Sequence, residues 1–213
     1  PDVLYADDEI LLMSEVQVAG GLSGTAQKHA AELLAALHGV VASHFGFDCA
    51  TVIGGLYQPN KKNENWVSFF RDQRLIYMAR ESLEAKRLPI KLMGRIERFS
   101  ENLENWLDNS AKPSLIHGDM WGGNVLSYNG KISGFIDPAI YYADSEIELA
   151  FSTMFNTFGH EFFERYSDFC KIRPGFFEER IDIYNLYPLL VHVRLFGGGY
   201  VSSVERTLNR FGF

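Results

Sequence analysis

The feature that most constrains this fold is a hairpin signal in the middle of a chain that is otherwise rich in helical patterns. Two short β-type runs, residues 125–128 and 131–136, flank the pair Asn129-Gly130. An Asn-Gly pair between two apolar runs is the strongest short-range signal for a two-residue hairpin turn, because both residues tolerate a positive φ. The sequence therefore predicts one small β-hairpin at the centre of the chain.

The long segments on both sides of this hairpin have apolar residues at helical spacing. Leu34 and Leu37 are among the residues that recur at this spacing in residues 25–44 and would form one buried helix face. The other expected helices are residues 64–86, a third helix from Met93 to Leu107 that Pro113 ends, residues 147–158, 162–169 and 181–195, and a last helix that contains Val204 and Leu208. We therefore expect an α+β fold that is mainly α-helical.

Three other stretches lack this period. Residues 9–16 include a short apolar run that predicts a buried strand, and residues 114–117 predict a second brief strand. Residues 46–63 carry Gly54 and Gly55 without a sustained period, which indicates an ordered loop. No internal repeat, low-complexity segment or flexible linker divides the sequence.

The composition excludes several classes of protein. The 213 residues are 46% hydrophobic and 22% charged, which suits a sizeable core and excludes a disordered or collagen-like chain. The formal net charge of -7 argues against a nucleic-acid partner, because phosphates attract basic surfaces. No apolar stretch approaches the roughly 18 residues that span a bilayer, and Cys49 and Cys170 fit a reducing compartment better than a disulfide framework. We expect a cytoplasmic protein without a nucleic-acid or membrane partner.

The candidate chemistry lies in two polar segments next to the hairpin. Before the hairpin the chain reads HGDMWGGN (residues 117–124), and the second strand ends in FIDP (residues 135–138). Phosphoryl transfer from a nucleotide needs a carboxylate that accepts a hydroxyl proton and oxygen ligands for Mg²⁺. Asp119 is the candidate base, and a hairpin can bring Asn124 and Asp137 together as magnesium ligands. Singly each could be an ordinary turn or cap residue, but the combination favours a kinase-type site.

These segments resemble the catalytic and metal-binding segments of the kinase-like small-molecule phosphotransferases, which include aminoglycoside and choline kinases. Further stretches are similar to one branch, the fructosamine (ketoamine) kinases. They are LYQPN (56–60), WVSFFRDQRL (66–75), DPAIYYADSEIELAF (137–151) and YNLYPLLVHVRLFGGGY (184–200). The resemblance therefore covers nearly the whole chain.

The resemblance implies a protein-kinase-like fold and an ATP-dependent activity. The family phosphorylates a sugar hydroxyl of a ketoamine, the adduct of a sugar and an amine, and the product then decomposes to free the amine. ATP and Mg²⁺ are the implied cofactors, and a small-molecule ketoamine or a glycated lysine is the implied substrate. Ser14, Glu15 and Val16 lie in a run similar to the family's hinge strand, whose backbone groups hydrogen-bond the adenine ring.

Several residues near the candidate site have both a functional and a structural interpretation. Trp121 could pack on the C–H face of a sugar or be a core tryptophan. Asp144, in an acidic cluster with Glu148, could attract an amine-bearing substrate or complement the dipole at a helix N-terminus. His192 could face the substrate cleft or be a hydrogen-bonded core histidine. The ring of His117 is expected to hold the loop by hydrogen bonds to backbone atoms.

The chain lacks the Gly-rich turn and the strand lysine that hold nucleotide phosphates in kinases. We therefore expect residues 1–22 to be a hinge strand and linker, residues 23–213 to be the helical C-terminal lobe, and a β-rich lobe to precede Pro1. The chain alone would then transfer phosphate poorly or not at all. Three alternatives remain open. They are a kinase for another alcohol, such as an aminoglycoside or a choline-like compound; a glycosidase that uses Asp119 and Asp137 as acid and base; and a non-catalytic binding module.

Overall fold

Helices are the main regular structure and contain about half of the residues, and the strands form short two-stranded sheets. The computed structural model describes residues 1–7 and 9–213. Within these residues the helices are α1 (Gly24–His38), α2 (Trp66–Phe70), α3 (Tyr77–Glu84), α4 (Ile90–Ser100), α5 (Glu146–Met154), α6 (His160–Ser167), α7 (Ile181–Phe196) and α8 (Gly199–Arg210). The strands pair in antiparallel twos, β1 (Val3–Ala6) with β2 (Leu11–Met13), β3 (Thr51–Ile53) with β4 (Leu56–Gln58), β5 (Ser114–Ile116) with β8 (Tyr141–Ala143), and β6 (Val125–Tyr128) with β7 (Lys131–Phe135). The expected mainly helical α+β fold is confirmed.

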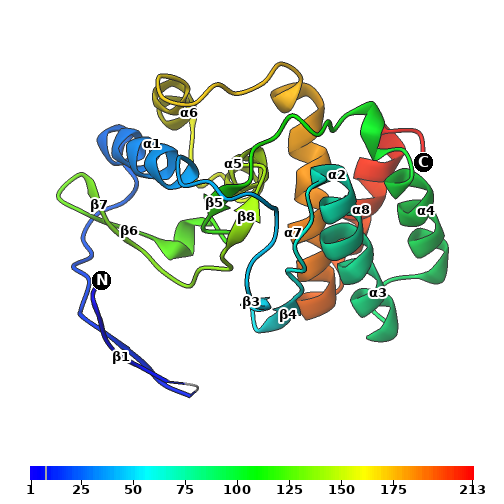
Figure 1. Cartoon of the computed structure of the whole chain (residues 1–213), viewed down its shortest axis with the longest axis horizontal. Helices are drawn as coiled ribbons and strands as arrows, with labels where there is room; N and C mark the ends of the chain where they lie inside the picture. Colours follow the sequence, from blue (N-terminus) through cyan, green and yellow to red (C-terminus); the bar gives the residue numbers. More distant parts are fainter. Residues whose placement is uncertain (8) are drawn as a thin grey trace.

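Helix α7 is the centre of the packing. It contacts α3, α5 and α8, while α1 lies along α6 on the other side of the molecule (Figure 1). Its side chains are apolar on all faces, and Ile183, Leu186 and Leu190 are fully buried. A helix that is apolar all round is stable only inside a core, so α7 fixes the positions of the elements that surround it.

The central hairpin is formed as the sequence predicts. Strands β6 and β7 pair with Tyr128 opposite Lys131. The turn residues Asn129 and Gly130 have φ values of 50° and 73°, the left-handed conformations that a two-residue turn of this kind requires. The hairpin therefore returns the chain directly to the segment that begins it.

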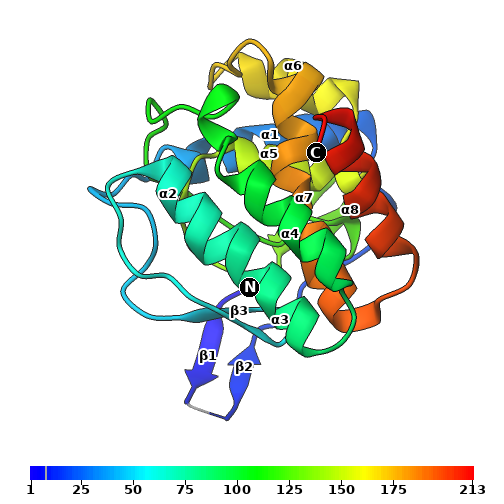
Figure 2. The ribbon, with the colours of Figure 1, turned by 90° about the vertical axis from the view of Figure 1, so that its right-hand side faces the viewer.

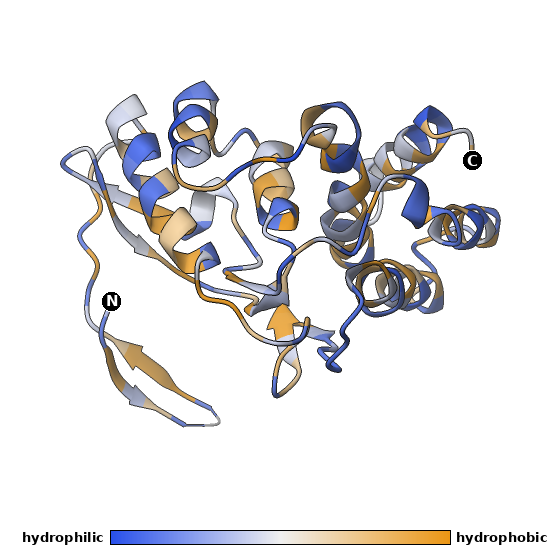
Figure 3. Ribbon diagram, turned by 45° about the horizontal axis from the view of Figure 1, so that its top comes forward, coloured by the Kyte–Doolittle hydropathy of each residue, from blue (hydrophilic) through white to orange (hydrophobic). Residues whose placement is uncertain are grey.

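The strand expected within residues 9–16 exists, but the expectation that it is buried is wrong. Strand β2 pairs with β1 in a hairpin that projects from the helices (Figures 1 and 2). Leu11 and Leu12 are 58% and 54% exposed, and much of the hairpin is apolar (Figure 3). An apolar run predicts a strand but does not by itself supply a second layer of structure that would cover it.

Two helix ends differ from the sequence expectation. The helix expected to reach residue 44 ends at His38, because Gly39 forms its C-cap and donates its N–H to Ala35 O. The third helix ends at Ser100, well before Pro113. There the Asn102 side chain donates to Arg98 O, and such a local side-chain bond competes with continuation of the helix.

Residues 46–63 form more regular structure than the expected loop. They contain the β3–β4 hairpin, whose turn residues Gly54 and Gly55 have positive φ values of 54° and 79°. Each strand has only three residues, too few for an alternating pattern to be visible in the sequence. No helix in residues 1–7 and 9–213 has the length and apolar character to cross a membrane.

Candidate active site

The loop that follows β5 is fixed by the ring of His117. Its Nε2–H donates to Ile136 O at 2.8 Å, and its Nδ1 accepts the N–H of Asp119 at 3.3 Å. The ring therefore joins the loop to the end of β7, where the second polar segment begins. The predicted structural role of this histidine is confirmed.

Gly118 can only be glycine in this arrangement. Its φ is +84°, and a Cβ atom would lie 2.2 Å from Ala139 O. Its N–H donates to Glu148 Oε1 at 2.7 Å. Close approach and positive φ both favour glycine, so the residue before Asp119 sets the backbone path of the loop.

The structure brings Asp119, Asn124 and Asp137 to one pocket. The Asn124 side chain is buried, and its Nδ2 donates to Asp119 O at 2.9 Å and to Asp119 Oδ2 at 3.0 Å. Asp137 follows β7 with a φ of +52°, so its side chain leaves the hairpin at the pocket. The predicted juxtaposition of Asn124 and Asp137 across the hairpin is therefore present.

Asp119 is half-buried, and burial raises the pKa of its carboxyl group. The hydrogen bond from Asn124 acts in the opposite direction and lowers that pKa, because it stabilises the ionised form. The net shift is upward. A carboxylate with a raised pKa is a stronger proton acceptor than an exposed one.

The residues present fit a magnesium ion. Both Nδ2 hydrogens of Asn124 are directed to Asp119, which leaves its Oδ1 as the free oxygen, and the Asp137 carboxylate is exposed in the same pocket. Amide and carboxylate oxygens are the hard ligands that Mg²⁺ prefers, and the ion commonly retains several waters.

The pocket has a volume of about 970 Å³ and two walls. The loop wall consists of Asp119, Trp121, Gly122, Gly123, Asn124, Asp137 and Pro138. The aromatic wall consists of Val52, Ile53, Gly54, Gly55, Phe151, Phe155, Val191, His192, Leu195, Phe196 and Tyr200. Among these described residues two are Asp and none is Lys or Arg, so the pocket favours a neutral or cationic ligand.

Trp121 lies in the pocket and is 43% exposed, unlike a core tryptophan. Its indole packs over the backbone of Gly123, where a Cβ atom would lie 2.3 Å from the ring. Its edge also meets Phe155, with ring centroids 6.3 Å apart. The ring therefore presents an apolar surface to the pocket beside Asp119.

His192 also lines the pocket. Its Nδ1–H donates to Pro188 O at 2.7 Å within α7, which leaves Nε2 as the ring nitrogen available to a ligand. The ring lies among Phe155, Phe196 and Tyr200, with centroid distances of 5.2, 5.7 and 4.8 Å. Both interpretations from the sequence apply in part, since the ring is hydrogen-bonded and also faces the cleft.

Asp144 lies outside the pocket, so the expectation that it binds substrate is not supported by its position. Its side chain is buried, forms an ion pair with Arg173, and accepts the hydroxyl of Tyr184 at 2.7 Å. It also accepts the N–H of Glu146 at 3.1 Å in the first turn of α5. These contacts correspond to the structural alternative, a carboxylate at a helix N-terminus.

The expected adenine-binding residues Ser14, Glu15 and Val16 also lie outside the pocket. The N–H of Ser14 donates to Asp2 O at 2.9 Å, so this group is already used. Val16 passes beside β7, where a Cβ atom on Gly134 would lie 3.3 Å from the Val16 side chain. The segment therefore runs along the strand that leads to Asp137.

Sequence reasoning missed a buried chain of hydrogen bonds behind the loop. Besides the N–H of Gly118, Glu148 binds Nε2 of His38 at 2.8 Å, and Nδ1 of His38 lies 2.6 Å from the Tyr166 hydroxyl. All three side chains are buried. The only signal in the sequence was the acidic cluster that includes Glu148. Phe155 had no signal beyond general apolarity, whereas Phe196 and Tyr200 lie in the stretch 184–200 that resembles the family.

Comparison with solved structures first defines the class of fold. A macrolide 2'-phosphotransferase type I aligns with 98% of this chain and 72% of its own, with a TM-score of 0.53 and 18% identity. At this identity the similarity concerns the fold alone, which this chain shares with that phosphotransferase. A candidate fructosamine-3-kinase from Thermobifida fusca aligns much more closely, with a TM-score of 0.88, 29% identity, and coverage of 99% of this chain and 73% of its own.

The chain belongs to the fructosamine kinase family, whose model matches residues 4–211. The resemblance inferred from the motifs is thereby confirmed. A protein of Vibrio parahaemolyticus, named a probable ketoamine kinase, is 38% identical over 78% of this chain and 56% of its own length. The ketosamine-3-kinase of Mus musculus is 38% identical over 75% of this chain and 51% of its own. The chain thus spans about half the length of these curated relatives.

Proposed function

We propose that this chain carries the catalytic and acceptor-binding part of an ATP-dependent phosphotransferase that phosphorylates a sugar hydroxyl of a ketoamine. One observation carries the proposal. The acidic and amide side chains Asp119, Asn124 and Asp137 share a pocket with an exposed tryptophan and an aromatic wall. The names of the related proteins support the ketoamine as substrate.

In this mechanism Asp119 accepts the proton of the attacking sugar hydroxyl. Its raised pKa makes it an effective acceptor once ionised. The hydrogen bond from Asn124 to Oδ2 at 3.0 Å fixes the carboxylate orientation. The other oxygen, Oδ1, is then directed to the substrate. Positioning of the hydroxyl is the main contribution expected from such a base, because phosphoryl transfer is largely controlled by alignment and charge.

Asn124 Oδ1 and Asp137 would hold Mg²⁺. The ion supplies charge neutralisation for the phosphates of ATP when bound. Backbone groups of Glu15 and Val16 would contact adenine, together with the carbonyl of Ser14, whose N–H is bonded to Asp2. Their place beside β7, next to the strand end that carries Asp137, supports this part of the proposal.

The pocket chemistry supports a sugar joined to an amine as the acceptor. The apolar face of Trp121 can pack on sugar C–H groups while Asp119 holds a hydroxyl. A protonated amine is attracted by the two carboxylates and by the faces of Phe155 and Tyr200. An anionic acceptor, such as a sugar carrying its own phosphate, is disfavoured because none of the described lining residues is basic.

We further propose that residues 23–213 are the helical lobe of the kinase-like fold and that residues 1–22 are its hinge segment and linker. Strands β1 and β2 and the segment beside β7 precede helix α1, which begins at Gly24, and this order supports the division. The free Cys49 and Cys170 support a reducing, cytoplasmic location.

The test is phosphorylation of a panel of alcohols, with Mg-ATP, by the protein purified from its full-length reading frame. We expect phosphate transfer to a fructosyl-amine and not to an aminoglycoside or choline. Asp119→Asn should lower the rate by about 10²–10⁴-fold, because it removes the proton acceptor. Asp168→Asn, a change at the exposed C-cap residue of α6, is the matched control and should leave the rate unaltered.

Two results would contradict the proposal. Transfer to an aminoglycoside but never to a ketoamine would exclude the substrate class. Bond hydrolysis that needs neither ATP nor Mg²⁺ would indicate the glycosidase alternative. An unchanged rate in Asp119→Asn would exclude the role of Asp119 as base.

A further inference from the structure

The segment LYQPN (residues 56–60) is singled out by its sequence, but the proposed mechanism does not use it. It forms β4 and the two residues that follow this strand, Pro59 and Asn60. Its two amide side chains are buried, Gln58 completely and Asn60 almost completely. Burying an amide is unfavourable unless its hydrogen bonds are satisfied, so the partners of these amides indicate what the segment does.

Gln58 makes a full set of hydrogen bonds to three different parts of the chain. Its Nε2 donates to Thr51 Oγ1 at 2.8 Å and to Ala139 O at 3.1 Å. Its Oε1 accepts the Tyr187 hydroxyl at 2.6 Å. Both amide hydrogens and the amide oxygen are thus used. A side chain of this length with two donors and an acceptor is required here, and glutamine is the residue that provides them.

The three partners of Gln58 belong to the structures that form the pocket. Thr51 precedes Val52 in the β3–β4 hairpin, whose turn lines the aromatic wall. Tyr187 lies one helical turn before Val191 on α7, which contributes to the same wall. Ala139 lies two residues after Asp137, the proposed metal ligand, and its own N–H donates to His117 O at 2.8 Å. Gln58 therefore joins the aromatic wall to the loop wall from behind.

A second buried side chain anchors the residues that directly follow Gln58. Arg74 is fully buried and donates from Nη2 to Asn60 Oδ1 and from Nη1 to Pro59 O, both at 2.6 Å. Its guanidinium lies 3.9 Å from the centre of the Tyr141 ring. Asn60 in turn donates to Thr51 Oγ1 at 2.9 Å. The base of the hairpin is thus held independently of Gln58.

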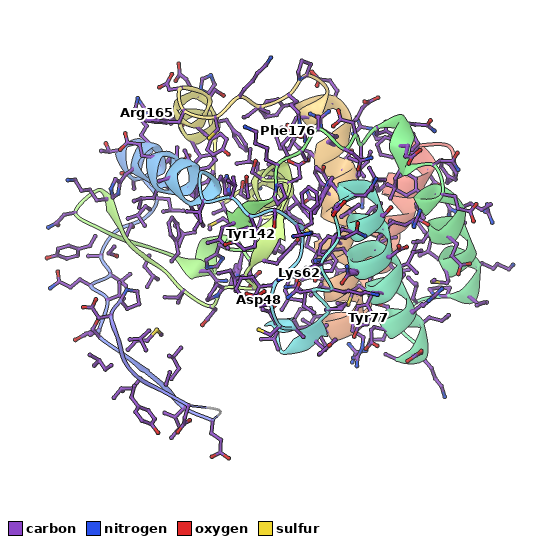
Figure 4. All side chains as sticks on the ribbon, in the orientation of Figure 1. Asp48, Lys62, Tyr77, Tyr142, Arg165 and Phe176 are labelled. Atoms are coloured by element: carbon purple, nitrogen blue, oxygen red, sulfur yellow. The ribbon has the colours of Figure 1, made fainter. Side chains whose placement is uncertain are left out.

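An exposed ion pair also closes this segment. Asp48 and Lys62 lie side by side in Figure 4, with Lys62 Nζ 2.6 Å from Asp48 Oδ1. Such exposed pairs contribute little to stability. The buried amide of Gln58 instead joins the base of the hairpin to α7 and to the segment after Asp137.

We propose that Gln58 is a positioning residue for the acceptor: it sets the width of the pocket by holding the β3–β4 turn against α7 and the segment after Asp137. The turn is closely packed, since a Cβ atom on Gly54 would lie 3.0 Å from the Leu195 side chain. The loop wall has its own supports in His117 and Glu148. Loss of Gln58 therefore displaces the turn and leaves Asp119 in place. This inference rests on the proposed function.

The test is the kinetic effect of Gln58→Met, which keeps side-chain length and removes all three hydrogen bonds. We expect the KM for the ketoamine to rise at least about tenfold, while kcat and the KM for Mg-ATP stay within about twofold. Tyr187→Phe, which removes one of the three bonds, should raise the same KM by a smaller factor. Tyr57→Phe is the matched control, because Tyr57 is the exposed neighbour on the same strand.

A second readout does not depend on catalysis. Backbone amides of residues 52–55 should exchange with solvent faster in Gln58→Met than in the unmodified protein, while those of β6 and β7 should be unaffected. If Gln58→Met does not fold, Gln58→Glu replaces it. That variant keeps the shape of the side chain but places an oxygen against Ala139 O.

The outcomes separate this inference from the proposed function. If the protein from the full-length reading frame, without substitutions, phosphorylates no ketoamine, the proposed function is wrong, and the exchange measurement alone decides the role of Gln58. If ketoamine is phosphorylated but both KM values and kcat change equally, or none changes, Gln58 does not position the acceptor. Unaltered exchange at residues 52–55 would equally overturn the inference.

Discussion

The two walls of the pocket differ in how the chain builds them. The loop wall comes from one continuous stretch, residues 119–138, folded back by a single hairpin. The aromatic wall comes from the β3–β4 turn, α5 with the residue after it, α7 and α8, which are far apart in the sequence. Chemistry is thus encoded locally, and recognition depends on tertiary packing.

Their supports differ in the same way. The loop wall is held by hydrogen bonds to its backbone, from the His117 ring and the Glu148 carboxylate. The aromatic wall is held by core packing around α7 and by the buried amide of Gln58. We therefore expect changes behind the loop wall to affect folding and turnover, and changes in the aromatic wall to affect substrate affinity.

The largest effect is expected for Glu148→Ala. It leaves the N–H of Gly118 and the His38 ring without their buried partner, and removing one member of a buried pair costs about 3 kcal/mol. Urea unfolding should show this loss, and kcat should fall because the backbone before Asp119 loses its support. Glu148→Gln keeps an acceptor for the N–H of Gly118 and should therefore recover much of the lost stability. Glu164→Ala, at an exposed position of α6, is the control. Equal stability of the two Glu148 variants would contradict the assigned support.

A smaller effect, on affinity, is expected for Trp121→Leu. The change removes the flat ring that faces the pocket, and loss of aromatic stacking and cation–π contact is worth about 1.5 kcal/mol. The KM for the ketoamine should rise by about tenfold, with the KM for Mg-ATP unchanged. Steady-state kinetics with each substrate varied in turn measures both values. Phe169→Leu, an exposed aromatic change on the C-terminal side of α6, controls for nonspecific effects, and an equal rise in both KM values would argue against a sugar-binding role.

The smallest effect is expected for His192→Phe. This variant keeps an aromatic ring among Phe155 and Tyr200 but removes the free Nε2. One lost hydrogen bond corresponds to about 1 kcal/mol, or roughly a fivefold rise in KM for the ketoamine. Isothermal titration of the acceptor should give the same factor. His160→Phe, an exposed histidine on α6, should not alter it. Unchanged affinity in His192→Phe would assign the ring to packing alone.

The sequence predicts the loop wall well because its signals are local. The Asn129-Gly130 turn, the loop role of His117 and the approach of Asn124 to Asp137 all depend on residues close in the chain. Turn conformation and short loops leave few alternatives for such a segment. The motifs HGDMWGGN and FIDP, which resemble those of the family, are visible in the sequence for the same reason: each is a short continuous segment.

The sequence could not predict contacts that depend on distant packing. Glu148 and His38 are 110 residues apart, and Gln58 and Tyr187 are 129 apart. The pattern of a single segment records its periodicity but not its neighbours. For the same reason the sequence leaves a substrate role open for Asp144, although its partner is Arg173, from a different segment.

The contact between Trp121 and Gly123 has a consequence for the interpretation of variants. Because the indole ring rests on the backbone at position 123, even an alanine there would tilt the ring out of the pocket. A variant of Gly123 would therefore reproduce the substrate defect of a tryptophan change without altering any group that contacts the sugar. In a mutational survey of this chain, a loss of substrate affinity caused by a change at position 123 would report the orientation of the Trp121 ring.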